Sequence, residues 1–209
     1  MVTDTATVPT PDTATAAGTP LRLAVIVAST REGRFGPKVA DWFTSRAALH
    51  ADLHADVIDL ADTPLPGSLS HRPGPEAAEA LAAVTPRLEA ADAFVVITPE
   101  YNHSYPAPLK NAIDWHYTPW QAKPVGFVSY GGVSGGLRAV EHLRPVFAEL
   151  HAVTVRHTVS FHNAGELFDA DGTLKDPKGP EAAATALLDQ LTWWARALRE
   201  ARDARPYVG

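Results

Sequence analysis

Runs of apolar residues alternate along the chain with segments in which apolar residues recur every three or four positions. The runs are rich in β-branched residues, which is typical of buried strands. The segments between them have the periodicity of helices that pack on one face. We therefore predict strands at 21–28, 53–60, 92–98, 123–130 and 153–159, and helices at 37–49, 76–90, 106–117, 137–150 and 181–204, with Pro86 expected to kink the second helix or end it early.

This alternation indicates an α/β fold with a doubly wound, five-stranded parallel sheet covered by helices on both faces. Right-handed crossovers restrict the possible topologies, and five strands suit the order 2-1-3-4-5. In such a sheet, ligands bind outside the carboxyl ends of the strands, where the strand order reverses. The loops that follow the first, third and fourth strands are expected to meet there.

Composition narrows the functional classes. The chain has 209 residues, a formal net charge of -6 and no cysteine. The charge and the lack of clustered basic residues argue against a nucleic-acid partner. The lack of cysteine excludes disulfides, thiolate catalysis and cysteine-based metal sites, and it fits a reducing cytoplasm, where we expect the protein to be located.

Residues 1–20 are rich in Thr, Ala and Pro and do not resemble a signal peptide. We expect a disordered tail at 1–20, one domain at 21–204 and a short C-terminal tail at 205–209. The apolar runs are far shorter than the roughly 20 residues that span a bilayer, so no membrane partner is expected.

The first loop, Ser29–Gly36, lies between a predicted strand and a predicted helix. It combines hydroxyl groups, two arginines and two glycines, and the helix that follows would point free N–H groups at one spot. The loop is neither a dinucleotide fingerprint nor a P-loop, which disfavours a classical dehydrogenase or an NTPase. Taken alone, it fits either an anion site or an ordinary polar turn.

The second loop, Pro99–Pro106, has a proline at each end and is rich in aromatic and amide groups. Such a stiff loop can lay backbone N–H groups along a planar heterocycle, or it can be a surface turn capped by Asn102. For His103 and His116, a satisfied surface or interface histidine is favoured over a metal ligand. Glu100 has no paired carboxylate or nucleophile in sequence, so it is given no general-base role.

The third loop, Ser129–Gly136, has glycine at half of its positions. Glycine permits a positive φ and a close approach of backbone to a flat ligand. The alternative is a flexible loop, which the flanking strand and helix disfavour. At Asp169–Gly172, a turn or hairpin is favoured over a calcium site because the closing acidic positions are missing. No metal site is predicted.

The three loops carry three motifs: Ser-x-Arg-x-Gly in the first, Pro-Glu-Tyr-Asn with Leu-Lys-Asn-Ala-Ile-Asp-Trp in and after the second, and Ser-x-Gly-Gly-x-Ser-Gly-Gly in the third. Over about residues 21–160, this combination resembles the NADPH-dependent FMN reductase (NAD(P)H:quinone reductase-like) family. The resemblance implies a flavodoxin-like fold, bound FMN, and a homodimer or homotetramer. By this resemblance, the flavin N5 takes a hydride from NADPH or NADH and passes it to a quinone, free flavin or similar small acceptor, with no catalytic side chain.

The resemblance assigns Ser29 and Arg31 to the FMN phosphate and the second and third loops to the two sides of the isoalloxazine ring. Many members have Ser-x-Asn where this chain has Arg34-Phe35-Gly36, so Arg34 either replaces a hydroxyl donor to phosphate or points to solvent. The residues assigned to the cofactor site are Ser29, Arg31, Arg34, Phe35, Gly36, Pro99, Glu100, Tyr101, Asn102, His103, Ser129, Gly131, Gly132, Ser134 and Gly135.

Two other readings stay open on the sequence. One is a flavodoxin-like electron carrier that serves protein partners, although the arginines of the first loop and the mild charge count against it. The other is a flavin-binding module that supplies a partner monooxygenase. Aromatic residues near the second loop and in the last helix are expected either in the core or in an isologous dimer contact: Trp115, Tyr117, Trp120, Trp193 and Trp194.

Overall fold

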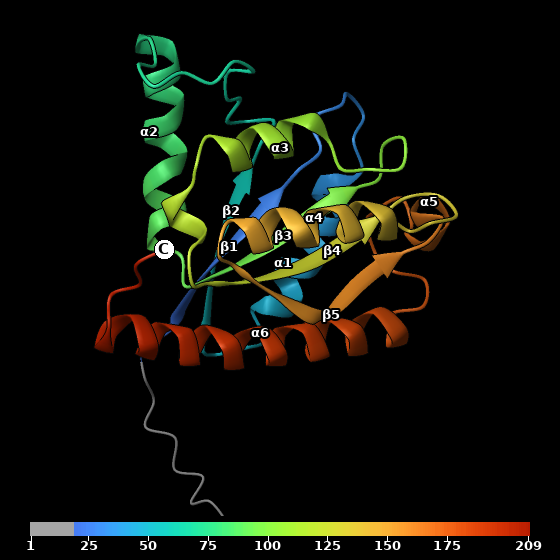
Figure 1. Ribbon diagram of the computed structural model, residues 1–209. Helices are drawn as coiled ribbons and strands as arrows, with labels where there is room; N and C mark the ends of the chain where they lie inside the picture. The colour runs from blue at the N-terminus through green and yellow to red at the C-terminus, as the bar shows by residue number, and fades with distance from the viewer. Residues whose placement is uncertain (1–18) are drawn as a thin grey trace, which may run out of the picture.

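The computed structural model describes residues 19–209, and the first 18 residues, which carry most of the expected N-terminal tail, lie outside the described part. The chain forms one five-stranded parallel sheet with the strand order β2-β1-β3-β4-β5, which confirms the predicted fold (Figure 1). The strands are β1 (Leu21–Val27), β2 (Leu53–Asp59), β3 (Ala93–Pro99), β4 (Pro124–Tyr130) and β5 (Val153–Phe161).

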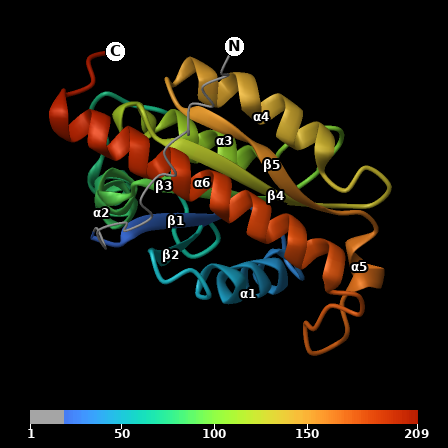
Figure 2. The ribbon, with the colours of Figure 1, turned by 90° about the horizontal axis from the view of Figure 1, so that it is seen from below.

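Helices cover both faces of the sheet, and each face has its own apolar core. On one face, α1 and α6 bury residues such as Phe43 and Leu187 against the strands, and Figure 2 shows α6 running across that face. On the other face, α2, α3 and α4 enclose Phe94, Trp120 and Phe147. The helices are α1 (Gly36–Ala47), α2 (Pro75–Ala90), α3 (Ala107–Asp114), the 3-10 turn η1 (Thr118–Trp120), α4 (Leu137–Glu149), α5 (Ala164–Leu167) and α6 (Lys178–Ala204).

Some element boundaries differ from the expectations. Pro86 lies inside α2, which continues to Ala90 without a break. The third helix ends at Asp114 rather than at Tyr117. Beyond it, the indole of Trp120 is buried in the core and donates a hydrogen bond to the His116 carbonyl (2.6 Å). The short helix α5 was not expected from the sequence.

The strand register brings the three unusual loops together. Val27 of β1 is level with Ile97 of β3, and Pro99 of β3 is level with Tyr130 of β4, so the chain leaves these strands at the same edge of the sheet. Among the described residues, no helix is long and apolar enough to cross a membrane.

Candidate functional site

The first loop presents unpaired hydrogen-bond donors in front of α1. In the described part of the chain, the amides of Thr30–Gly33 donate no hydrogen bond. Helix α1 has no side-chain cap and no acidic residue in its first turn. An uncapped helix start with free amides attracts anions, because the helix dipole and the N–H groups favour negative charge at that point.

Two buried hydroxyls lie beneath this loop. Ser29 is fully buried and Tyr130 is nearly so, and neither Ser29 Oγ nor Tyr130 OH has a partner with acceptable hydrogen-bond geometry in the described residues. Both surround Gly36, where a Cβ atom would lie 2.3 Å from Ser29 Oγ and 3.0 Å from Tyr130 OH. A side chain at this position would have to displace one of these hydroxyls, whereas the φ angle of Gly36 is not one that requires glycine.

Tyr130 was not predicted as a site residue, although it stands directly before the glycines of the third loop. Burial raises the pKa of its hydroxyl to about 12. The neighbouring Ser29 hydroxyl and the positive charge of Arg34 lower the pKa, but by less than burial raises it. The tyrosine therefore stays neutral and can act as a hydrogen-bond donor. Its place next to the first glycine was a signal in the sequence, but only the fold shows that it reaches the first loop.

Three arginines act differently at the site. The guanidinium of Arg31 is exposed and lies 5.7 Å from the centre of the Tyr101 ring, which joins the first loop to the second. Arg34 turns back instead, and its Nη1 lies 2.6 Å from Asp59 Oδ1 and 3.0 Å from the Ser29 carbonyl. Arg138, at the start of α4, was not predicted from the sequence.

The second loop is a tight hairpin turn. The backbone amides and carbonyls of Tyr101 and Ser104 bond reciprocally, at 2.8 and 3.1 Å. The two residues between them, Asn102 and His103, have φ angles of 48° and 75°. Both left-handed residues fit a two-residue turn, and asparagine adopts this region more readily than most residues. The strained turn fixes the exposed side chains of Asn102 and His103 at the carboxyl edge of the sheet.

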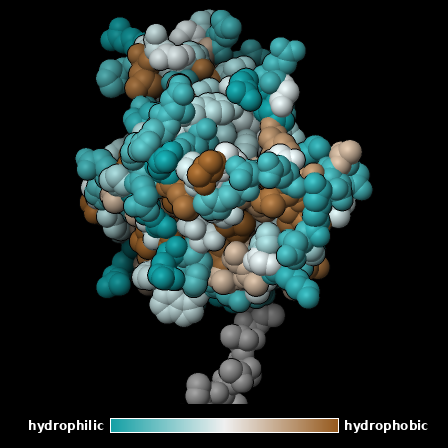
Figure 3. All heavy atoms as spheres, turned by 90° about the vertical axis from the view of Figure 1, so that its right-hand side faces the viewer, coloured by the Kyte–Doolittle hydropathy of each residue, from teal (hydrophilic) through white to brown (hydrophobic). Residues whose placement is uncertain are grey.

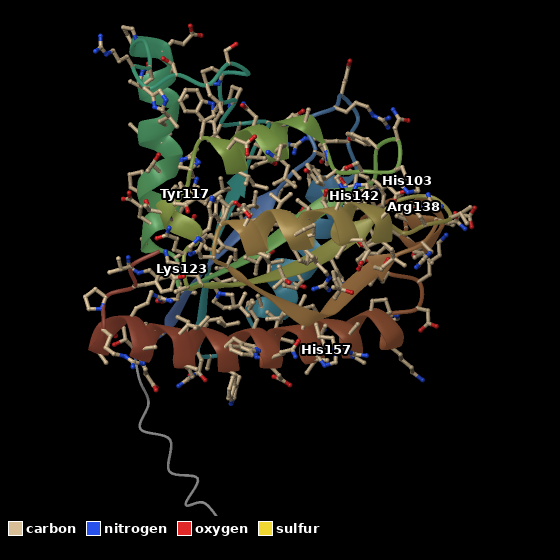
Figure 4. The ribbon with its side chains drawn as sticks, viewed as in Figure 1. His103, Tyr117, Lys123, Arg138, His142 and His157 are labelled. Atoms are coloured by element: carbon tan, nitrogen blue, oxygen red, sulfur yellow. The ribbon has the colours of Figure 1, made fainter. Side chains whose placement is uncertain are left out.

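Glu100 joins the second loop to the third. Its side chain is 7% exposed, and its carboxylate accepts from Arg138 Nη1 (2.9 Å) and from the Arg138 backbone amide (3.2 Å). Burial alone would raise the pKa of this carboxyl, but hydrogen bonds from Ser134 and Arg138 outweigh burial and hold the pKa below its ordinary value. Glu100 thus caps α4 as an anion, and Figure 4 shows Arg138 beside His103 and His142 at this end of the molecule.

The third loop directs its carbonyl groups inward. The carbonyls of Gly131–Gly136 all accept hydrogen bonds. By contrast, within residues 19–209 the amides of Gly132–Ser134 donate none. Gly135 and Gly136 have φ angles of 60° and 82°, which glycine alone adopts freely. The loop therefore offers N–H groups without partners to a ligand, whereas its carbonyl groups are already engaged with the protein.

A fourth segment, which sequence reasoning missed, holds the third loop in this orientation. The amides of Asn163 and Ala164 donate to the carbonyls of Gly132 (2.8 Å) and Gly131 (3.1 Å). The Ser160 hydroxyl donates to the Gly135 carbonyl, and His162 Nδ1 lies 2.8 Å from the Val133 carbonyl. These residues lie at or just after the carboxyl end of β5, so their role follows from strand order and not from a local motif.

The histidines and acidic residues form no metal centre among the described residues. The His116 ring has a partner at both nitrogens, 2.9 Å from Thr85 Oγ1 and 2.7 Å from the Ala112 carbonyl, but it is buried in the core and not at the surface or an interface as expected. Ser104 Oγ lies 3.0 Å from His142 Nδ1.

At Asp169–Gly172 the chain forms the favoured hairpin turn, closed by a bridge between Phe168 and Leu174.

A cavity of about 580 Å³ lies beside the first loop, between α3 and the segment that follows β2. Asn111 and Trp115 of α3 hold this segment by donating side-chain hydrogen bonds to the carbonyls of Leu65 (2.9 Å) and Pro66 (2.8 Å). Trp115 therefore braces the cavity wall, whereas Trp120 lies in the core. Trp193 is 63% exposed on α6 and packs edge-on against Trp194.

The sequence model of the NADPH-dependent FMN reductase family matches residues 21–166, which include all three loops. The chain belongs to this family. It is similar to an NAD(P)H-dependent FMN reductase of Schizosaccharomyces pombe, with 38% identity over 122 residues, 55% of this chain and 60% of that enzyme. The chain thus spans about 60% of the length of that family member.

Two further comparisons cover most of their counterparts. A 2-hydroxy-1,4-benzoquinone reductase of a Burkholderia species is 30% identical over 184 residues, 84% of this chain and 97% of the relative. Among solved structures, the flavoenzyme NAD(P)H:(acceptor) oxidoreductase FerB from Paracoccus denitrificans matches with a TM-score of 0.66 and 26% identity, covering 83% of this chain and 98% of FerB. The first comparison rests on sequence and the second on the fold, and each spans more than four fifths of this chain.

Proposed function

We propose that this chain is an FMN-dependent NAD(P)H oxidoreductase that reduces a quinone, a free flavin or a similar small acceptor. The observation that carries the proposal is the buried Ser29 hydroxyl without a partner, next to the free amides of Thr30–Gly33 and the uncapped start of α1. A buried polar group without a partner is costly, and a bound phosphate oxygen offers it one. Membership of the family supports FMN as the source of that phosphate.

The choice between two helix starts also supports this placement. Both α1 and α4 follow glycine-containing loops and lack a cap from their own N-cap residue. At α4, however, the Glu100 carboxylate already accepts a hydrogen bond from the Arg138 amide. At α1, no carboxylate among residues 19–209 accepts from the first amides of the helix. A phosphate is therefore repelled from α4 and attracted to α1. We assign Ser29, Arg31, Arg34, Phe35 and Gly36 to the phosphate end of the cofactor site.

The second and third loops are proposed to hold the flavin ring. The unpaired amides of Gly132–Ser134 suit electron-rich ring atoms, and they can stabilise the negative charge of a reduced flavin. Tyr101, linked to Arg31, is proposed to position the ring relative to the phosphate. The residues assigned to the ring are Pro99, Glu100, Tyr101, Asn102, His103, Ser129, Gly131, Gly132, Ser134 and Gly135.

Bound FMN would supply the capacity to accept a hydride from NADPH or NADH and release it to the acceptor. The chain's own residues bind the phosphate, hold the ring against the glycine loop and keep the Tyr130 hydroxyl neutral. No side chain of the three loops is assigned a proton-transfer role, because Glu100 is engaged as a helix cap and held in its charged form.

We also propose that the protein is a cytoplasmic homodimer or homotetramer. Val133 and Leu137, at the tip of the third loop and the start of α4, are 87% and 42% exposed. Apolar side chains also interrupt the hydrophilic surface on the face that carries His103 and Arg138 (Figure 3). Burial of exposed apolar side chains against a second copy would be favourable. Sedimentation at micromolar protein checks this, and a strictly monomeric profile would contradict it.

The absorption spectrum of the purified full chain tests the proposed function. We expect a yellow protein that releases FMN on heating, and bleaching of the flavin by NADPH or NADH without oxygen. Steady turnover of a small quinone without any added protein would separate an oxidoreductase from an electron carrier or a monooxygenase component. A colourless protein that binds no added FMN would overturn the proposal.

A further inference from the structure

Arg34 lies under the first loop instead of reaching outward. Its Nη1 is shared between the Ser29 carbonyl (3.0 Å) and Asp59 Oδ1 (2.6 Å), and both side chains of the ion pair are less than one fifth exposed. Neither of the two roles that the sequence left open, a phosphate donor or a solvent-facing side chain, describes this arrangement. The guanidinium faces the protein.

Asp59 is itself held firmly. It is the last residue of β2, and its Oδ1 also accepts a hydrogen bond from the Ala61 amide (3.0 Å). Its carbonyl accepts from the Thr63 hydroxyl (2.8 Å). The carboxylate is therefore fixed by the turn that follows β2, and Arg34 transmits this fixed position to the first loop.

The contact between Arg34 and the Ser29 carbonyl orients the peptide unit between Ser29 and Thr30. In a trans peptide, the carbonyl of one residue and the amide of the next point in opposite directions. Because Arg34 holds the Ser29 carbonyl on the protein side, the Thr30 amide is directed away from the protein, where it has no hydrogen-bond partner among the described residues. The same peptide follows the Ser29 side chain, whose hydroxyl also lacks a partner.

We propose that Arg34 and Asp59 act as one positioning unit, which holds the Ser29–Thr30 peptide ready for an anionic phosphoryl group, and that Arg34 does not bind that group itself. Arg31 is then the arginine that contacts the ligand, since its guanidinium is exposed and has no carboxylate partner within residues 19–209. The naming of FMN as the ligand rests on the proposed function, but the positioning role does not.

The substitutions Arg34→Met and Asp59→Asn, alone and combined, test the proposal in the apo protein. The affinities for FMN and for riboflavin, which lacks the phosphate, are measured by quenching of flavin fluorescence. We expect each single variant to weaken FMN binding about tenfold, and the double variant to be no worse than either, because the two residues act as a unit. Riboflavin affinity is expected to stay unchanged, which a general loss of structure would not allow.

If Arg34 contacted the phosphate directly, the variants would behave differently. Asp59→Asn would then free the guanidinium and leave FMN binding equal or tighter, or the two effects would add; either result overturns the proposal. Asp56→Asn is a matched control, because it breaks the Asp56–Arg87 ion pair on the same strand away from the loop, and it is expected to leave FMN affinity unchanged.

A second probe separates this inference from the proposed function. If the wild-type chain binds neither flavin, the proposed function fails, and calorimetric titration with inorganic phosphate still tests the positioning unit. Weaker phosphate binding by Asp59→Asn than by wild type supports it. Equal binding by the two proteins, or none by the wild type, overturns it.

Discussion

The carboxylate of Glu100 caps the helix that begins beside Arg138, with Oε2 3.2 Å from the Arg138 amide and Oε1 2.9 Å from its guanidinium. One acidic side chain thereby fixes two loops that lie on neighbouring strands. It also decides which helix start is left open to an anion, because α1 has no comparable cap. The geometry of the candidate site depends on this contact as much as on the glycines.

Replacement of Glu100 by glutamine tests that contact. We expect the free energy of unfolding at neutral pH to fall by about 1 kcal/mol, because a neutral amide is a weaker helix cap than a carboxylate. Since the pKa of Glu100 in the folded protein lies below its ordinary value of 4.5, the stabilisation is present above pH 4.5 and is lost as the pH falls through the folded-state pKa. Urea unfolding at neutral and acidic pH measures this; an equal deficit at both would contradict it.

Glycine at position 136 is required by the backbone. Its φ is 82°, and a Cβ atom there would lie 2.7 Å from the Ser129 Cβ and 2.9 Å from the Tyr130 amide. We expect Gly136→Ala to lower the free energy of unfolding of the apo protein by about 1–3 kcal/mol. Gly132→Ala is the control, because no atom lies within 4 Å of its Cβ position. Thermal unfolding compares the two variants, and equal effects would refute the steric argument.

Arg31 is expected to contact the FMN phosphate directly. Replacement by methionine removes the charge but keeps most of the aliphatic chain, so we expect FMN binding to weaken about tenfold through loss of a charge-assisted hydrogen bond. Riboflavin binding is expected to be unaffected. Fluorescence titration of the two flavins measures the difference, and full retention of FMN affinity by the variant would show that Arg31 is not a phosphate ligand.

Lys123 lies at the opposite end of the sheet from the candidate site (Figure 4), where its amine donates to the carbonyls of Leu88 and Glu89 at the end of α2. Burial, and next the charge of Arg202, lowers its pKa to about 8 from 10.5. The folded protein therefore binds fewer protons than the unfolded chain between these values, so this lysine makes stability rise with pH from about 8 to 10.5.

The Lys123→Met variant is expected to lack that rise. Urea unfolding on the alkaline side measures the slope of stability against pH for both proteins. The comparison is cleanest below pH 10, because the raised pKa of Tyr130 has the opposite effect above it. The same slope in variant and wild type would assign the alkaline dependence to other groups.

The cavity wall after β2 is expected to depend on Trp115. Trp115→Phe keeps the ring but removes the indole donor to the Pro66 carbonyl, and Asn111 remains as the second tie. We expect faster amide hydrogen exchange in residues 60–63, whose amides are hydrogen-bonded at the start of this segment, with no change in the strands. Mass spectrometry of peptic fragments measures this, and unchanged protection of the segment would mean that Asn111 alone holds it.

The hydrophobic pattern alone determined the sheet and the place of the site. Continuous apolar runs that alternate with helices, such as those of β1 and β3, indicate a parallel sheet covered on both faces, and right-handed connections restrict the possible strand orders. Because the carboxyl ends of parallel strands share one edge, three loops distant in sequence had to meet. Their glycines, prolines and hydroxyls were compatible with an anion and a flat ring, and the resemblance of the three motifs to one family favoured that interpretation over ordinary turns.

Only the tertiary structure decided which side chain does what within those loops. The sequence left the role of Arg34 open between phosphate and solvent, but Asp59 lies at the end of a neighbouring strand and draws its guanidinium inward. Glu100, Tyr130 and the segment after β5 gained their roles because strand register placed them against groups more than 25 positions away along the chain. Partner choice for a charged or polar group is set by distance in space, which local sequence does not encode.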